Sequence, residues 1–248
     1  MGRFETTVDY YRYREPYPPE FFARVAQFAD LSRETRLLDV GCGPGILAIG
    51  FAPYVGSCTA IDREPEMLRA ARDAAAAAHV DIRFVETTIE ELHTPDDSFD
   101  FVCVGRALHW LNNEKALAVF EKIISPGGRI AICGSTASAA DVNAWDKPYK
   151  QLRRSWSDDP HETRYRVDLD KWFAPSRFRK LGAIFVAHRH RVTVDDLVKR
   201  MFSFSTTSPA ILGEKQPQVE AEIRALLEPF AKDGSMEEEL DVKAAVFG

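Results

Sequence analysis

In the first half of the chain, short apolar runs typical of strands alternate with segments that have apolar residues at helical spacing. This alternation predicts strands separated by helices. Five short apolar runs indicate strands: 36–40, 58–61, 81–85, 99–104 and 129–133. Helical spacing or helix-forming composition indicates helices at 20–28, 45–51, 65–78 and 113–124. Residues 125–128, Ser-Pro-Gly-Gly, predict a sharp turn into the fifth strand. The alternation predicts a parallel, doubly wound sheet with right-handed crossovers.

The pattern weakens after Gly134. Residues 136–176 show no clear strand, although they contain Trp145, Trp156 and Trp172. A strand returns at 183–191, residues 193–232 have helical spacing, and 241–247 indicate a last strand. We expect one domain, 1–248, made of an N-terminal lid and helix (1–30), a core (36–134) and a cap (136–176 and 193–232). The tryptophans of the cap either enclose a substrate, as we expect for Trp145, or anchor a small core of the cap itself.

Composition narrows the partners and the compartment. The 248 residues carry a net charge of −6 and a sequence pI of about 5.6, which argues against nucleic acid or an anionic membrane as the main partner. No apolar run is long enough to span a bilayer, and no secretory signal is visible in the first twenty residues, so we expect a cytoplasmic protein. The four cysteines are scattered near strands, which predicts free buried thiols.

The most informative segment runs from Leu37 to Gly45, with the sequence LLDVGCGPG. A strand there ends on Asp39, a glycine-rich turn follows, and a helix begins. Glycines allow left-handed backbone and let a ligand lie against bare main chain. Ligands of open α/β sheets bind outside the carboxyl ends of the strands. Asp62, at the end of the second strand, suits the two hydroxyls of a ribose; the alternative is that it only caps the next helix.

Two cofactors fit such a turn. A dinucleotide site needs glycine or alanine at position 46, so that a helix N-terminus faces the pyrophosphate, but this position is Ile46. Asp39 ahead of the turn would repel a pyrophosphate and suits a ligand with an ammonium group. S-adenosylmethionine has an ammonium, a sulfonium and no phosphate, so the residues favour it. The alternative for Asp39 is a strand-end carboxylate satisfied by turn amides.

These residues resemble motif I of the class I S-adenosylmethionine-dependent methyltransferases, and Asp62 resembles the acidic residue of motif II. Residues 86–92 resemble the loop that holds adenine, 98–102 with Leu108-His109-Trp110 resemble motif IV and the segment after it, and 125–129 resemble the turn before strand five. The resemblance covers about 36–134. The segment from Tyr11 to Pro18 and the His109-Trp110 pair resemble the small-molecule branch, the trans-aconitate methyltransferase-like, type 11 methyltransferases.

The resemblance implies a Rossmann-like seven-stranded sheet, mostly parallel, whose last strand is antiparallel and lies beside strand six. It implies methyl transfer to an oxygen, nitrogen or carbon of a small molecule, with S-adenosylhomocysteine as product and no metal ligands, in a monomer or homodimer. The cofactor residues that it implies are Arg14, near the carboxylate of the cofactor, with Tyr17, Asp39, Gly41, Gly43, Asp62, Arg63, Thr88, Ile89 and Arg106. Tyr11, Trp110 and Trp145 would bind the substrate.

Three positions leave alternatives open. His109 is the candidate general base, although a His-Trp pair is also a plausible aromatic wall of the pocket. Thr88 stands where the family often has an aspartate that accepts the amine of adenine, while Glu90 and Glu91 are interpreted as a solvated helix face. Arginines at 153, 154, 164 and 166 are either bidentate partners of a carboxylate substrate or surface charges. Further hypotheses are a carboxyl O-methyltransferase of a small acid, a non-catalytic adenosylmethionine-binding protein and, more distantly, an NAD-dependent oxidoreductase.

Overall fold

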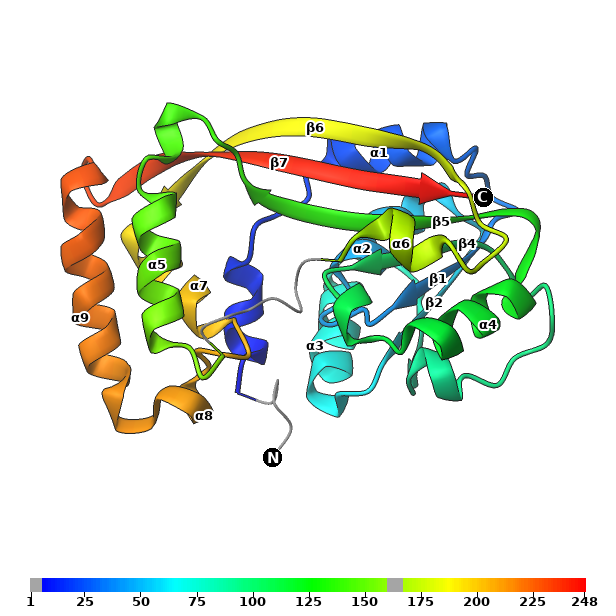
Figure 1. Cartoon of the computed structure of the whole chain (residues 1–248), viewed down its shortest axis with the longest axis horizontal. Coiled ribbons are helices and arrows are strands. Elements are labelled where there is room, and N and C mark those ends of the chain that lie inside the picture. Colours follow the sequence, from blue (N-terminus) through cyan, green and yellow to red (C-terminus); the bar gives the residue numbers. More distant parts are fainter. Residues whose placement is uncertain (1–5, 160–166) are drawn as a thin grey trace. The chain divides into compact units, whose positions relative to one another are not determined.

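The computed structural model describes residues 6–159 and 167–248, which divide into two compact units. We call residues 17–134, 167–186 and 242–248 the sheet unit, and residues 6–16, 135–159 and 187–241 the helical unit. Three long strands, 124–137, 180–193 and 235–247, each have residues in both units (Figure 1). Neither unit is therefore a continuous segment of the chain. Arg164 and Arg166, which the sequence offered as carboxylate partners, lie outside the described residues.

The strands form a seven-stranded sheet in the order β3-β2-β1-β4-β5-β7-β6. β1 pairs in parallel with β2 and β4, β2 with β3, and β4 with β5, while β7 is antiparallel to both neighbours. This confirms the mostly parallel sheet with an antiparallel last strand beside strand six. The strands are β1 (Arg36–Val40), β2 (Ser57–Asp62), β3 (Arg83–Glu86), β4 (Phe99–Gly105), β5 (Ile124–Ala137), β6 (Lys180–Thr193) and β7 (Ser235–Phe247).

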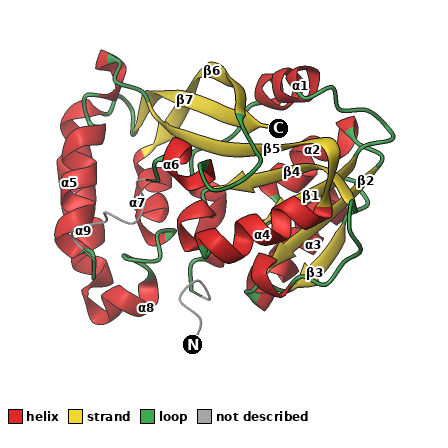
Figure 2. Ribbon diagram, turned by 45° about the vertical axis from the view of Figure 1, so that its right-hand side comes forward, coloured by secondary structure: helices red, strands yellow, loops and turns green. Residues whose placement is uncertain are grey.

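Helices cover both faces of the sheet unit (Figure 2). On one side, Phe22 of α1 (Pro19–Phe28) packs edge-on against Phe51 of α2 (Ile46–Phe51), with ring centres 5.0 Å apart. On the other, α4 (Asn113–Ile123) and α6 (Leu169–Phe173) share an apolar cluster with β4 and β5. α3 (Pro65–Ala77) follows β2 and begins with the proline that the sequence pattern placed there.

Two sequence expectations need correction. The turn expected at 125–128 lies inside β5, as an irregularity in its pairing with β4: Phe99 pairs with Ile124, whereas Phe101 pairs with Arg129. Gly127 has φ +79° there, so the predicted turn conformation exists without ending the strand. Trp172 was expected in the cap, but it packs in the core of the sheet unit, 6.4 Å from the ring of Phe120, because α6 returns to that face.

The helical unit is built from α5 (Asp146–Trp156), α7 (Val194–Phe202), the short α8 (Pro209–Leu212) and α9 (Gln216–Leu227). The helices expected over 193–232 are therefore present. α5 and α9 lie side by side (Figure 1), joined by a 2.8 Å hydrogen bond from Trp156 Nε1 to Glu222. Trp145 is only 1% exposed and packs within the apolar cluster of this unit, as the core alternative for the tryptophans would have it.

All four cysteines are free and buried, as expected: Cys42, Cys58, Cys103 and Cys133. Each belongs to the sheet unit. Within the described ranges, no helix is both long enough and apolar enough to cross a bilayer.

Candidate cofactor site

The turn between β1 and α2 lies against the end of β4. Gly41, Gly43 and Gly45 all have left-handed backbone, with φ of +64°, +52° and +80°. A Cβ on Gly41 would stand 2.6 Å from the Cβ of Ala107, which is closer than non-bonded carbon atoms approach in proteins. Glycine is therefore required at this position both by conformation and by space. The turn presents bare backbone at the carboxyl edge of the sheet.

Asp62 joins the glycine turn to the end of β2. One carboxylate oxygen accepts a 2.8 Å hydrogen bond from the Gly43 amide, and the other accepts a 2.9 Å bond from the Glu64 amide. Burial raises the pKa of Asp62, while the amides of Glu64, Gly43 and Arg63 act to lower it. A carboxylate has room for about four hydrogen bonds, so these two amides leave acceptor capacity for further donors such as the hydroxyls of a ribose.

Asp39 has a contact that sequence reasoning did not assign to it. Its carboxylate is 1% exposed and accepts a 3.0 Å hydrogen bond from the Ala48 amide, in the first turn of α2. Burial raises the pKa of Asp39 to about 7; the Ala48 amide and the Cys103 thiol oppose this rise, and the charge of Asp62 adds to it. The carboxylate thus binds the start of α2. This arrangement resembles the alternative stated above, in which nearby amides satisfy the Asp39 carboxylate.

The loop after β3 lies next to Asp62 because the Thr87 amide donates to the Asp62 carbonyl at 3.1 Å. Thr88 is half-buried and precedes the 3-10 helix Ile89–Glu91, in which Ile89 is buried. Glu90 accepts a 2.8 Å bond from the Asn112 amide, so it ties this loop to the start of α4. No local signal in the sequence indicated this partner. Glu90 is partly exposed and Glu91 is exposed, which agrees with the interpretation of the two as a solvated face. Arg63 is directed to solvent, with a side chain 74% exposed.

The end of β4 continues into Arg106, Ala107 and the 3-10 helix Leu108–Trp110. Arg106 is a non-glycine residue with φ +57°. Its guanidinium carbon lies 4.9 Å from the ring centre of Tyr17, which is buried against Phe21. His109 and Trp110 have ring centres 4.9 Å apart, and Trp110 is 41% exposed.

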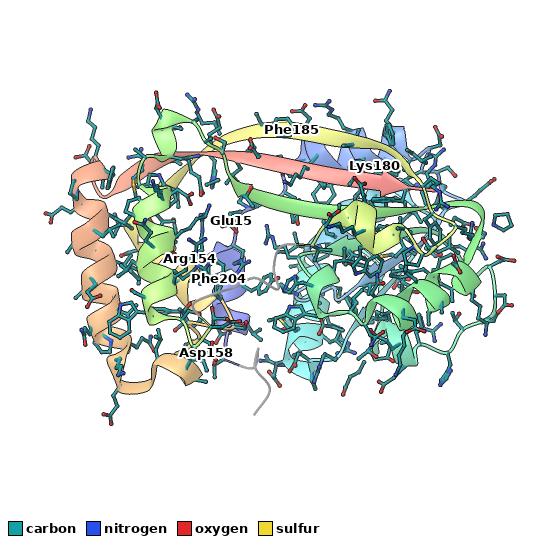
Figure 3. All side chains as sticks on the ribbon, in the orientation of Figure 1. Glu15, Arg154, Asp158, Lys180, Phe185 and Phe204 are labelled. Carbon is teal, nitrogen blue, oxygen red and sulfur yellow. The ribbon has the colours of Figure 1, made fainter. Side chains whose placement is uncertain are left out.

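The remaining predicted residues belong to the helical unit. The Arg14 guanidinium lies 3.9 Å from the ring centre of Phe204 and 5.8 Å from that of Tyr11 (Figure 3 labels Phe204). Trp145 is enclosed in the apolar cluster of that unit. The structure therefore brings together the predicted cofactor residues from Tyr17 to Arg106 in one unit, and it places Tyr11, Arg14 and Trp145 in the other.

Comparison with known proteins finds a family match for this part of the chain. Residues 38–132, which contain the glycine turn, Asp62 and the end of β4, match the family described as "Methyltransferase domain". This segment of the chain is similar to the methyltransferase domain of the class I type. The matched segment ends one residue before Cys133, so the family match covers the core and not the helical unit.

Curated proteins are similar to the chain over part of their length. An uncharacterized methyltransferase of Bacillus subtilis, YcgJ, is 36% identical over 106 residues, 42% of each chain. A malonyl-[acyl-carrier protein] O-methyltransferase of Enterobacter lignolyticus is 31% identical over 137 residues, 54% of this chain and 49% of that protein. The matched regions thus span about half the length of these curated relatives.

The fold is also found in a solved structure described as a putative type II methyltransferase from Anaeromyxobacter dehalogenans. It is 20% identical, with a TM-score of 0.68, and the alignment covers 94% of this chain and 96% of that one. This likeness concerns the fold.

Proposed function

We propose that the protein is an S-adenosylmethionine-dependent methyltransferase that acts on a small molecule. The observation that carries this proposal is the pair of carboxylates at the glycine turn. Asp39 occupies the Ala48 amide in the first turn of α2. A dinucleotide would use the N-terminus of this helix for its pyrophosphate, so the protein's own carboxylate stands in the way. Asp62 remains at the rim, on the Gly43 amide.

The residues of the sheet unit fit the methyl donor in other respects. Asp62 would accept the ribose hydroxyls, Thr88 and Ile89 would line the adenine, and the Gly41 turn would admit the amino acid part against bare backbone. Arg63 and Arg106 supply positive charge along the same edge. The ammonium of the cofactor would lie near Asp39. When bound, the cofactor supplies a methyl group on a positively charged sulfur.

The chain contributes alignment to the reaction. Methyl transfer is an in-line displacement, which gains most when the acceptor atom is held at near-contact distance from the methyl carbon. Trp110, exposed beside His109, offers an aromatic surface for the acceptor at the end of β4. His109 would remove a proton from an acceptor that needs to lose one. The acceptor atom is an oxygen, a nitrogen or a carbon.

A carboxyl O-methyltransferase of a small acid is the second candidate. In the helical unit, Arg14 and Arg153 both approach the ring of Phe204, at 3.9 and 4.1 Å from its centre. The same segment buries Thr206 Oγ1 and Ser208 Oγ, which have no hydrogen-bond partner among the described residues. Guanidinium groups and hydroxyls recognise carboxylates, and one relative is named as an O-methyltransferase of malonyl-acyl-carrier protein.

Calorimetric titration with S-adenosylmethionine tests the central proposal. We expect micromolar-range binding, weakened about tenfold or more by Asp62→Ala, because a group that accepts charge-assisted hydrogen bonds is lost. Asp96→Ala is the matched control: this aspartate is 70% exposed and pairs with Lys122 at 3.4 Å. No binding by the unmodified protein, or tighter binding of NADH, would contradict the proposal.

Turnover distinguishes an enzyme from a binding protein. Small acids, phenols and amines are offered with the cofactor, and formation of S-adenosylhomocysteine is measured. A methyl ester formed from trans-aconitate would support the second candidate, and Arg153→Gln should then raise the KM for the acid. Binding of the cofactor without turnover on any acceptor would favour a non-catalytic role.

A further inference from the structure

The order of the strands assigns the parts of the cofactor along the carboxyl edge. This step rests on the proposed function. Parallel neighbours lie about 4.8 Å apart, so the ends of β3, β2, β1 and β4 form a row roughly 14 Å long. Thr88 and Ile89 follow β3, and Asp62 ends β2. With adenine and ribose at these two positions, the amino acid part extends over the Gly41 turn toward the end of β4.

The amino acid part carries a carboxylate, which needs a cation at that end of the row. The loops after β1 to β4 in the sheet unit contain two arginines, Arg63 and Arg106. Arg63 follows β2, beside the ribose position, and its guanidinium lies 3.6 Å from Glu64 with a largely exposed side chain. Arg106 follows β4, where the row ends. Of these two arginines, only Arg106 therefore lies at the end of the row where the carboxylate of the amino acid part is expected.

Arg106 is held in a particular arrangement. Its neighbour Ala107 contacts the Gly41 turn, so the Arg106 backbone lies directly beside it. Its guanidinium lies over Tyr17, and the Tyr17 hydroxyl in turn approaches the end of β4 at Gly105. The backbone of Arg106 is left-handed, a conformation that glycine adopts without strain and arginine does not. A strained non-glycine residue at a ligand edge is typical of a position where the side chain itself is needed.

We propose that Arg106 binds the carboxylate of the methionine part of S-adenosylmethionine, and that the Tyr17 ring positions its guanidinium. A guanidinium can donate two parallel hydrogen bonds to a carboxylate. The resemblance described above assigned this contact to Arg14, whose guanidinium packs on Phe204 in the helical unit. The assignment to Arg106 uses residues of the sheet unit alone.

The test compares two ligands that differ in one group. S-adenosylmethionine and its decarboxylated form, which lacks only the carboxylate, are titrated into the unmodified protein and into Arg106→Gly. We expect the unmodified protein to prefer the carboxylated ligand by about tenfold or more, and Arg106→Gly to bind both equally. Arg106→Lys should keep part of the preference. Tyr17→Leu should reduce the preference without abolishing binding of the decarboxylated form.

Controls separate this role from a structural one. Arg106→Gly relieves backbone strain, so its Tm should equal or exceed that of the unmodified protein. His79→Gly is the matched variant, since His79 also has a left-handed backbone, φ +55°, at the end of α3. It should keep the full preference, and so should Arg14→Gln.

Two results would overturn the assignment. One is that Arg106→Gly retains the preference of the unmodified protein. The other is that Arg14→Gln loses it, which would assign the carboxylate contact to Arg14. A failure of the proposed function is distinct, because the unmodified protein would then bind neither ligand.

Discussion

The two units use their buried charges in different ways. In the sheet unit, Asp39 and Asp62 bind backbone amides 9 and 19 residues away, within one strand-turn-helix segment and its neighbour. In the helical unit, Arg200 pairs with Glu238 through two bonds of 2.6 and 2.8 Å and donates to the Tyr13 carbonyl, 187 residues away. Local carboxylates that bind turn amides leave a recognisable motif in the sequence. Ion pairs between distant segments leave none.

The difference also concerns function. The carboxylates of the sheet unit lie at the carboxyl ends of β1 and β2, where the proposed cofactor would contact Asp62 and approach Asp39. The Arg200–Glu238 pair is enclosed, with side chains 4% and 0% exposed, and His190 adds a 2.9 Å contact to the same carboxylate. Because Arg200 also bonds to Tyr13, the pair fixes the N-terminal segment onto α7. We infer that the first arrangement serves binding and the second serves folding.

The largest expected effect is on the enclosed pair. Arg200→Leu leaves the fully buried Glu238 without its main partner, so the free energy of unfolding should fall by about 3–5 kcal/mol. Urea unfolding followed by tryptophan fluorescence measures this. The double variant Arg200→Leu/Glu238→Leu should recover most of the loss, since no buried charge remains. A single variant as stable as the unmodified protein would contradict a folding role for the pair.

The next effect is a pH dependence at Asp39. Its pKa is about 7 in the folded protein against an ordinary value of 3.8. Well below pH 3.8 the carboxyl is protonated in both the folded and the unfolded state, so its ionisation does not affect stability there. As the pH rises to 7 and beyond, the unfolded state releases the proton first, so the folded state loses stability, by a few kcal/mol at most. Asp39→Asn cannot ionise.

The measurement for Asp39 is the unfolding free energy of both proteins between pH 4 and 8. The free energy of unfolding of Asp39→Asn should rise relative to that of the unmodified protein as the pH increases across this range. The difference should level off above pH 7. A constant difference would show that the pKa of Asp39 in the folded protein is not raised, and would contradict this prediction.

The smallest effect compares two glycines with the same backbone. Gly41→Ala meets both a left-handed backbone and the Cβ of Ala107 at 2.6 Å, whereas a Cβ on Gly127, φ +79°, has nothing within 4 Å. Gly127→Ala should cost about 1 kcal/mol from backbone strain, and Gly41→Ala about 1–3 kcal/mol more from the clash. Thermal unfolding of both variants measures the difference. Equal costs would mean that the end of β4 yields easily, and that the glycine turn is less rigid than its contacts indicate.

Sequence patterns predicted the parallel half of the molecule well, because each strand and helix there is short and has its own boundary signals. β1 occupies the expected residues, and α3 begins at the expected proline. Both ends of β5 and β6 and the beginning of β7 were not predicted, since these strands extend beyond their apolar stretches. The partner of Glu90 and the place of Trp172 depend on tertiary contacts with no local pattern.

The candidate site divides in the same way. The glycine turn and Asp62 were selected from residue types and spacing, and the loop at Thr88 from the family resemblance. Two contacts were not predicted. The hydrogen bond of Asp39 is to an amide at the start of α2, and the packing of Arg106 on Tyr17 joins residues 89 positions apart in the sequence. Sequence patterns locate the edge of the sheet; they do not show which side chains meet there.

The placement of the cysteines provides a reporter for one unit. All four thiols lie in the sheet unit, and burial raises the pKa of each of them, with the charge of Asp39 adding to the effect. A buried, protonated thiol does not react with alkylating reagents. The rate of thiol alkylation in native buffer therefore measures how often the sheet unit opens, and it is blind to opening of the helical unit. A ligand bound at the carboxyl edge should slow that rate, which makes cofactor binding measurable without any knowledge of the methyl acceptor.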